Sequence, residues 1–183
     1  MTVMFMGLIA LIIIILVVLV LFLISIYNNI QNYIIRIEEA ENNIDAVLRK
    51  RFDLLNNSID IIKNETKVED ELMASVIKLK EEKISNFDLD RALYDGIKEF
   101  NKYKDEYPNL SKNESFTKLD IELNESEAEI LAFKKYYNDI ITEYNKLVKS
   151  FPAVLIAMIF KFKKKLYFDG KNMEDDDVKD FKL

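Results

Sequence analysis

The chain of 183 residues contains no cysteine and no histidine. Their absence excludes disulfides, Cys/His zinc sites, thiol nucleophiles and the Ser-His and Cys-His catalytic pairs, because each needs a soft ligand or a base that titrates near neutrality. It also excludes the Glu-x-x-His pairs of four-helix di-iron proteins. Only carboxylates and carbonyls could hold a metal, and the sequence identifies no cofactor and no small-molecule substrate.

Glycine and proline are scarce, with three and two residues, although 50% of the sequence is hydrophobic. Sandwiches, barrels and Gly-rich phosphate loops depend on these residues at their turns, so long uninterrupted helices fit the composition best. The net charge of -6 argues against nucleic acid as a partner, since nucleic acid selects a basic face. Part of the negative charge lies in residues 169–183, which we expect to form a flexible acidic tail.

A long apolar run opens the sequence. No Asp, Glu, Lys or Arg occurs from Met1 to Ile35, and Leu8 to Ile24 is an unbroken run of 17 aliphatic or Phe residues. At about 1.5 Å per residue, Val3 to Tyr27 is long enough to cross a hydrocarbon core of roughly 30 Å. We predict that residues 1–27 form a transmembrane anchor, with Tyr27 and Tyr33 at the position of an aromatic belt.

A cleavable signal peptide is the alternative interpretation of this run. Signal peptides carry a basic n-region, a short hydrophobic region and small residues at the cut site. None of these features is present, which favours an uncleaved, single-pass anchor in the cell membrane. The basic residues near the span all follow it, at Arg36, Arg49, Lys50 and Arg51. The positive-inside rule then places the rest of the chain on the cytoplasmic side.

Two long series of apolar residues, spaced alternately by four and three, predict two long helices. The first series runs from Ile30 to Ile62 and the second from Leu119 to Phe151. Because the first series begins directly after the span, we expect one helix to continue from the membrane into the soluble domain. Two shorter series, Val68 to Phe87 and Leu89 to Tyr107, lie between them.

Three junctions carry a capping-box pattern, in which a hydroxyl caps an amide and an acid three residues later reaches back. The pairs are Thr66 with Glu69, Ser85 with Asp88, and Ser111 with Glu114. Three junctions imply four helices, and short connections make neighbours antiparallel. We therefore predict an all-α protein: an N-terminal transmembrane helix followed by an up-and-down antiparallel four-helix bundle, residues 28–151, with long first and last helices and coiled-coil packing.

An apolar and basic segment, residues 152–168, follows the last predicted helix. Ala153 to Phe160 is an apolar octet, and four lysines come after it, Lys161, Lys163, Lys164 and Lys165. The octet is too short to span a bilayer, but an even number of helices returns it to the membrane side. One interpretation is contact with the membrane surface, with the lysines on anionic head groups. The other is a hydrophobic flap that closes the end of the bundle.

A set of short stretches after the anchor forms a recognisable pattern. It includes Glu39-Ala40, Ile44-Asp45, Asp53-Leu54-Leu55, Tyr107-Pro108-Asn109-Leu110, Asn113-Glu114, Tyr137-Asn138, Tyr144-Asn145, Ser150-Phe151-Pro152 and Tyr167-Phe168. In this order and spacing the chain resembles the LemA family. The resemblance implies a bacterial, membrane-anchored helical bundle with no established catalytic activity, serving the upkeep of the cell envelope.

The chain departs from the pattern of that family at three places. Where the family usually reads Ile-Pro-Asn-Leu, this sequence has Leu55-Asn56-Asn57-Ser58, and a proline in the first helix is missing. Where the family usually reads Phe-Gly-Phe, this sequence has Phe160-Lys161-Phe162, and an Arg before the Tyr-Asn pair is Lys134. Any role tied to the proline or the glycine does not carry over.

Polar residues occupy several positions of the two long seams, where an unpaired buried charge would be expensive. Antiparallel pairing of the first and last helices joins residues whose numbers sum to roughly 178. This register places Arg51 opposite Glu127, and we predict a contact between them. It also places Glu41 opposite Tyr137 and Asn138. We interpret these residues as interhelical polar contacts that fix the register of the bundle.

Asn145 lies one heptad after Asn138, so it joins these candidate interhelical contacts. A polar groove for a partner or an ion is the functional interpretation of the same residues. A catalytic interpretation has little support, because Glu41, Asp45 and Asp53 have no nucleophile, cofactor loop or metal spacing beside them.

These features favour a non-catalytic scaffold or adaptor in the bacterial cell envelope, whose partners are the lipid bilayer and other membrane or envelope proteins. A sensor that transmits a ligand or envelope signal along the first helix is the alternative. An enzyme with a carboxylate-bound metal is the third and least supported hypothesis. Asn-x-Ser/Thr triplets, among them those at Asn56, Asn64, Asn113 and Asn124, would report translocation of the bundle in an insertion assay.

Overall fold

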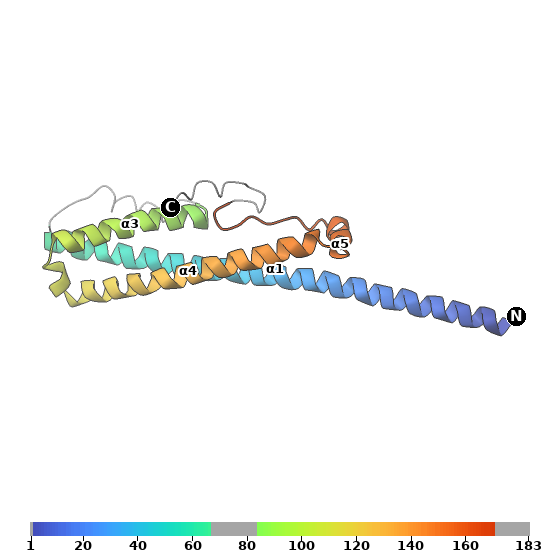
Figure 1. Cartoon of the computed structure of the whole chain (residues 1–183). Helices are drawn as coiled ribbons and strands as arrows, with labels where there is room; N and C mark the ends of the chain where they lie inside the picture. The colour runs from blue at the N-terminus through green and yellow to red at the C-terminus, as the bar shows by residue number, and fades with distance from the viewer. Residues whose placement is uncertain (1, 67–83, 171–183) are drawn as a thin grey trace. The chain divides into compact units, whose positions relative to one another are not determined.

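The structure is a computed structural model that describes residues 2–66 and 84–170. Within these ranges the chain is all-helical and has no strand, as predicted. The elements are α1 (Thr2–Thr66), α3 (Asn86–Glu106), the 3-10 helix η1 (Leu110–Lys112), α4 (Glu114–Lys149) and α5 (Ala153–Phe160) (Figure 1). Most of the predicted second helix and nearly all of the predicted acidic tail fall on residues 67–83 and 171–183, outside the described residues, so the four-helix arrangement stays a prediction.

The first helix runs from the apolar N-terminal segment to Thr66 without a break. α1 contains 65 residues, and it passes through Asn56 and Asn57, where the family pattern has a proline, as regular helix. Side chains from Met4 to Phe22 are all exposed, which is the burial expected of a helix whose neighbours are lipids. Among the described elements, α1 is the one helix long and apolar enough to cross a membrane.

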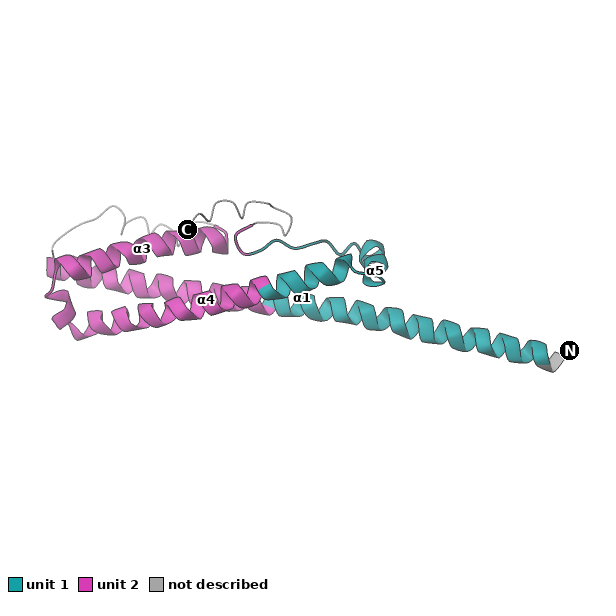
Figure 2. Cartoon of the chain, viewed as in Figure 1, with its two compact units in different colours: residues 1–38, 139–167, 171–183 teal, residues 39–138, 168–170 magenta. Residues whose placement is uncertain are grey.

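The chain forms two compact units (Figure 2). Unit 1 comprises residues 1–38, 139–167 and 171–183, and unit 2 comprises residues 39–138 and 168–170. α1 and α4 contribute residues to both units. Unit 1 therefore contains the apolar part of α1, the end of α4 and all of α5.

In unit 2, α4 packs antiparallel to α1 in the predicted register. Arg51 contacts Glu127, and Tyr137 contacts Glu41, two pairs with the same residue-number sum. α3 is antiparallel to α4 as well, because Lys104 bonds Asp120 near one end while Lys134 bonds Asp90 near the other. Apolar side chains at the four-three positions fill the space between the helices: Ala40, Ile44, Leu48, Leu55, Ile59, Ile62, Leu93, Phe100, Phe116, Leu123 and Ile130.

The helix starts follow the predicted caps at one described junction and differ at another. Ser85 Oγ accepts a hydrogen bond from the Asp88 amide and caps α3 as expected. The prediction that Ser111 caps the last helix is wrong. Ser111 lies in η1, and Asn113 Oδ1 accepts from the amides of Ser115 and Phe116 instead. Residues 110–112 form the 3-10 turn that follows Pro108, so α4 starts later than predicted and its first free amides lie within reach of Asn113.

The core of unit 1 joins α1, α4 and α5. Its buried apolar side chains are Ile30 and Ile37 from α1, Ile140, Ile141, Tyr144 and Val148 from α4, and Ala153, Ile156 and Ala157 from α5. α4 ends at Lys149, two residues before the predicted end at Phe151, and the chain then turns at Pro152 into α5. The apolar octet thus forms a helix of its own that packs through one face only.

Candidate functional site

Arg51 is the charged residue buried most deeply at the α1–α4 seam of unit 2. Its side chain is 2% exposed, and its Nη2 donates to Glu127 Oε2 at 2.6 Å. Glu127 is 47% exposed, so solvent reaches the carboxylate while the guanidinium stays inside. Arg51 Nε is buried and has no hydrogen-bond partner. The structure therefore brings together the two residues that the register pairs, and it leaves part of the guanidinium unsatisfied.

A charged hollow of about 330 Å³ opens beside this ion pair in unit 2. Its lining comes from three helices, with Arg51 on α1, Asp90, Arg91, Tyr94 and Asp95 on α3, and Glu127 and Lys134 on α4. Three cations and three carboxylates balance one another, so the hollow selects neither anions nor cations as such. Across residues 2–66 and 84–170, no group of carboxylates is placed to hold a metal ion.

Tyr137 and Glu41 form a second polar contact between α1 and α4 of unit 2. The Tyr137 hydroxyl donates to Glu41 Oε1 at 3.3 Å, and the Tyr137 ring is 8% exposed. Burial, and then the charge of Glu41 and the hydrogen bond to it, raise the pKa of Tyr137 to about 12. The phenol therefore stays protonated at any physiological pH and acts as a hydrogen-bond donor, not as a base.

Asn145, expected at an interhelical contact, instead holds an extended segment, and that expectation needs correction. Its Nδ2 donates to the Lys165 carbonyl at 2.8 Å, and its Oδ1 accepts from the Lys165 amide at 2.9 Å. One residue earlier, the Tyr144 hydroxyl donates to the Lys163 carbonyl at 2.9 Å. We call residues 161–167 the strap. The buried side chains of Tyr144 and Asn145 need hydrogen-bond partners. The backbone groups of the strap are available for this role, because they form no helix or sheet.

Asn138 makes a similar contact in unit 2. Its Oδ1 accepts from the Phe168 amide at 2.9 Å. The Phe168 ring lies near the rings of Phe87 and Tyr137, with centroids 6.0 and 6.4 Å away, and Lys134 Nζ stands 5.2 Å above it. Asn138, Tyr144 and Asn145 of α4 therefore bond backbone groups that follow α5, whereas Tyr137 bonds the Glu41 side chain. The spacing of one heptad between Asn138 and Asn145 marks both residues as candidates for polar contacts, but no pattern in the sequence indicates that their partners lie in irregular chain.

The four candidate membrane-surface lysines lie at the start of the strap in unit 1. Lys161, Lys163 and Lys164 are exposed, and Lys165 is half-buried because its backbone pairs with Asn145. Lys161 adopts the left-handed conformation, with φ 58°, and closes α5, since the Phe162 amide bonds the Ala157 carbonyl. This is the position at which the family pattern has glycine, and the conformation explains that preference.

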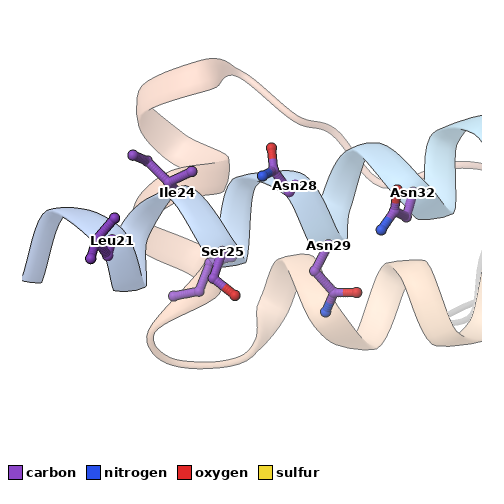
Figure 3. Close-up of a pocket in the computed structure, with 7 residues that line it drawn as sticks. Leu21, Ile24, Ser25, Asn28, Asn29 and Asn32 are labelled. Atoms are coloured by element: carbon purple, nitrogen blue, oxygen red, sulfur yellow. The ribbon is translucent and has the colours of Figure 1, made fainter. Parts of the chain in front are cut away.

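Aromatic rings join this segment to the end of the apolar part of α1, also within unit 1. The Tyr27 ring centroid lies 4.8 Å from that of Phe160 and 5.8 Å from that of Phe162. Polar side chains begin on α1 at the same level, where Ser25, Asn28, Asn29 and Asn32 line a shallow hollow of about 560 Å³ (Figure 3). The sequence predicts Tyr27 in an aromatic belt, but it does not indicate that the rings of Phe160 and Phe162 pack against it.

Comparison with known proteins agrees with the pattern of short stretches. A model of the LemA family matches residues 40–180, which is most of the chain after the apolar run. No curated protein matches the sequence. The match includes both Tyr-Asn pairs, the strap, α5 and the residues that line the charged hollow of unit 2. On this evidence the chain belongs to the LemA family.

Proposed function

We propose that this protein is a membrane-held scaffold or adaptor of the bacterial cell envelope, which binds other proteins and catalyses no reaction. The observation that carries the proposal is the charged hollow of unit 2, because it combines a buried cation with an exposed aromatic side chain. Family membership and the apolar start of α1 support the membrane setting. The up-and-down four-helix arrangement is part of the same proposal and rests on the antiparallel α1–α4 and α3–α4 pairings.

The rim of the hollow has the chemistry of a protein-binding hot spot. Tyr94 is 61% exposed, and Arg91 is exposed with its guanidinium 5.7 Å from the Phe87 ring. Tyr and Arg are enriched at hot spots because each offers a large contact area together with hydrogen bonds. The charges of both signs that line the hollow favour a partner segment of mixed charge, because such a segment can pair with both the cations and the carboxylates.

A photo-reactive amino acid in place of Tyr94 tests this proposal in native membranes. We expect discrete crosslinked products, identified by mass spectrometry as envelope proteins. The matched control carries the same residue in place of Ile121, which is 53% exposed on α4. Equal crosslinking from both positions, or none from Tyr94, would count against the hollow as a docking site.

The cytoplasmic placement of the bundle belongs to the proposal and rests on the basic residues that follow the span. The triplets at Asn56, Asn64, Asn113 and Asn124 supply the test. In a microsomal insertion assay we expect no glycan at any of them. Glycosylation would show that the bundle had been translocated and would reverse the proposed orientation.

A sensor or transducer is the second candidate function, and the continuity of α1 favours it. One uninterrupted helix from Thr2 to Thr66 could carry a displacement from the membrane into unit 2. A Gln31→Pro substitution interrupts that helix just beyond the span, because proline removes a backbone bond and kinks a helix. A transducer would lose signalling in this variant, whereas a scaffold would keep its partners.

A further inference from the structure

We propose that α5 is a second membrane contact of this protein, beside the span. Its exposed apolar face lies among the lipids of the bilayer that α1 crosses, and the lysines that follow it bind anionic head groups. The inference stands on unit 1 alone and does not depend on the scaffold function.

α5 is apolar on both faces, but the fold covers only one of them. Ala153, Ile156 and Ala157 form a buried stripe at helical spacing. The opposite side is exposed, with Leu155 at 46%, Met158 at 64% and Ile159 at 70% of their maximum. Exposed apolar side chains gathered on one helix face mark a surface that another apolar phase covers.

The position of α5 on α1 identifies the bilayer as that phase. The rings of Phe160 and Phe162 pack on Tyr27, the first aromatic residue after the apolar run. The side chains from Met4 to Phe22 on α1 are exposed, and polar side chains first appear around Tyr27, with Ser25 before it and the amides of Asn28, Asn29 and Asn32 after it. Figure 3 shows these amides on the same stretch of helix as Leu21 and Ile24. α5 therefore lies at the level where hydrocarbon gives way to head groups.

The charge near α5 fits an anionic lipid surface. Residues 144–168 contain six lysines and no Asp or Glu. Lys161, Lys163 and Lys164 are exposed directly after the apolar helix. A lysine near an anionic membrane surface is worth about 1 kcal/mol, which corresponds to about a fivefold change in binding. Apolar side chains followed by lysines form the usual combination of an interfacial segment.

The strap holds α5 in this position, so little ordering accompanies lipid contact. Tyr144 bonds the Lys163 carbonyl, and the Asn145 amide bonds both backbone groups of Lys165. These hydrogen bonds fix the end of the segment on α4. Because the backbone of this segment is already ordered, α5 can contact the bilayer without the entropy cost of folding a free peptide.

Site-specific fluorescence in vesicles tests the proposal on the full chain. The sequence has no cysteine, so a single Met158→Cys substitution gives one labelling site for an environment-sensitive dye. The protein is reconstituted in vesicles of phosphatidylcholine with phosphatidylglycerol, containing lipids brominated on the acyl chain. A label in place of Leu16 reports the span, and a label in place of Ile121 reports the exposed surface of unit 2.

We expect the Met158→Cys label to lose fluorescence to the brominated lipids, as the Leu16→Cys label does, while the Ile121→Cys label keeps its emission. Quenching of the Met158→Cys label by aqueous iodide instead would overturn the proposal. Protection from both quenchers would overturn it too, because it would show that protein covers α5, as a flap at the end of the bundle would require.

A charge variant tests the head-group contact separately. The variant chain has Lys161, Lys163 and Lys164 all changed to Gln. Each substitution should lower the equilibrium constant for contact of α5 with the bilayer by about fivefold. We therefore expect the quenched fraction of the Met158→Cys label to fall. The fall should be smaller in vesicles of phosphatidylcholine alone. An unchanged quenched fraction in the anionic vesicles would refute the contribution of the lysines.

Discussion

At the scale of single residues, the seam of unit 2 is organised around a charge that solvent does not reach. Arg51 is buried, yet its partner Glu127 is half-exposed, so the fold bears the desolvation of one ion only. The guanidinium keeps one bond to the carboxylate and leaves its Nε unsatisfied. Such a pair stabilises the fold less than apolar packing would, but it strongly disfavours any register that separates the two residues.

Removing the carboxylate should therefore cost more than removing the guanidinium. We expect Glu127→Gln to lower the free energy of unfolding by about 2 kcal/mol, because it leaves the guanidinium buried without its counter-ion. Arg51→Met should be nearly neutral, since a long apolar side chain refills the seam. Denaturant unfolding measures both. The matched control is Glu129→Gln, whose 3.4 Å contact with Lys50 is solvent-exposed. Equal losses in the two Glu variants would refute the argument.

Tyr137 makes the stability of the fold sensitive to alkali. Its pKa is raised from 10.0 to about 12, so between these values the unfolded chain loses the phenolic proton first. Stability is thus fully present below pH 10 and is lost as the pH rises through the folded pKa. We expect the melting temperature of the wild type to fall more steeply over this interval than that of Tyr137→Phe. Parallel curves for the two proteins would contradict the assigned pKa shift.

The pairing of Arg51 with Glu127 could be predicted because both helices are regular and their register follows from the apolar spacing. The partner of Asn145 could not be predicted, although Asn145 itself was a candidate for a polar contact. Lys165 lies in extended chain, where no periodic pattern relates one backbone group to another. The start of α4 was misplaced for a related reason, since Ser111 and Asn113 both precede a helix and only the 3-10 turn decides between them.

At the scale of elements, the strap depends on one amide side chain. We expect Asn145→Ala to lower the free energy of unfolding by about 2 kcal/mol, because it leaves the part-buried amide and carbonyl of Lys165 without their side-chain partner. Hydrogen exchange should show faster exchange of the Lys165 amide. Lys146→Ala, at the exposed neighbouring position, serves as control. Protection of Lys165 that survives in Asn145→Ala would contradict the role given to the strap.

The end of α5 carries strain that glycine would relieve. Lys161 has φ 58°, a conformation in which a side chain costs roughly 1 kcal/mol. We expect Lys161→Gly to stabilise the fold by about that amount in thermal unfolding, while removing one charge from the proposed lipid surface. Lys163→Gly, in which no positive φ is relieved, should not stabilise it. Destabilisation by Lys161→Gly would show that the lysine side chain itself supports the turn.

At the scale of the whole molecule, α1 explains why the outline of the fold was accessible from sequence. The apolar run and the four-three seam lie on one uninterrupted helix, so hydropathy and periodicity together predict both the anchor and the first helix of the domain. α5 was recognised as an apolar octet, but its one-sided packing depends on contacts with distant parts of the chain. A segment of eight residues is too short for its periodicity to distinguish a flap on the bundle from a lipid-facing helix.

Affinity purification from solubilised native membranes tests the central claim, that the protein works by binding partners through the charged hollow. The wild type is compared with an Arg91→Ala and Tyr94→Ala double variant, and with Ile121→Ala as the matched surface control. We predict that the wild type and Ile121→Ala retain the same envelope proteins in stoichiometric amounts and that the double variant loses them. Identical recovery from all three proteins, or no stoichiometric partner with the wild type, would contradict the account.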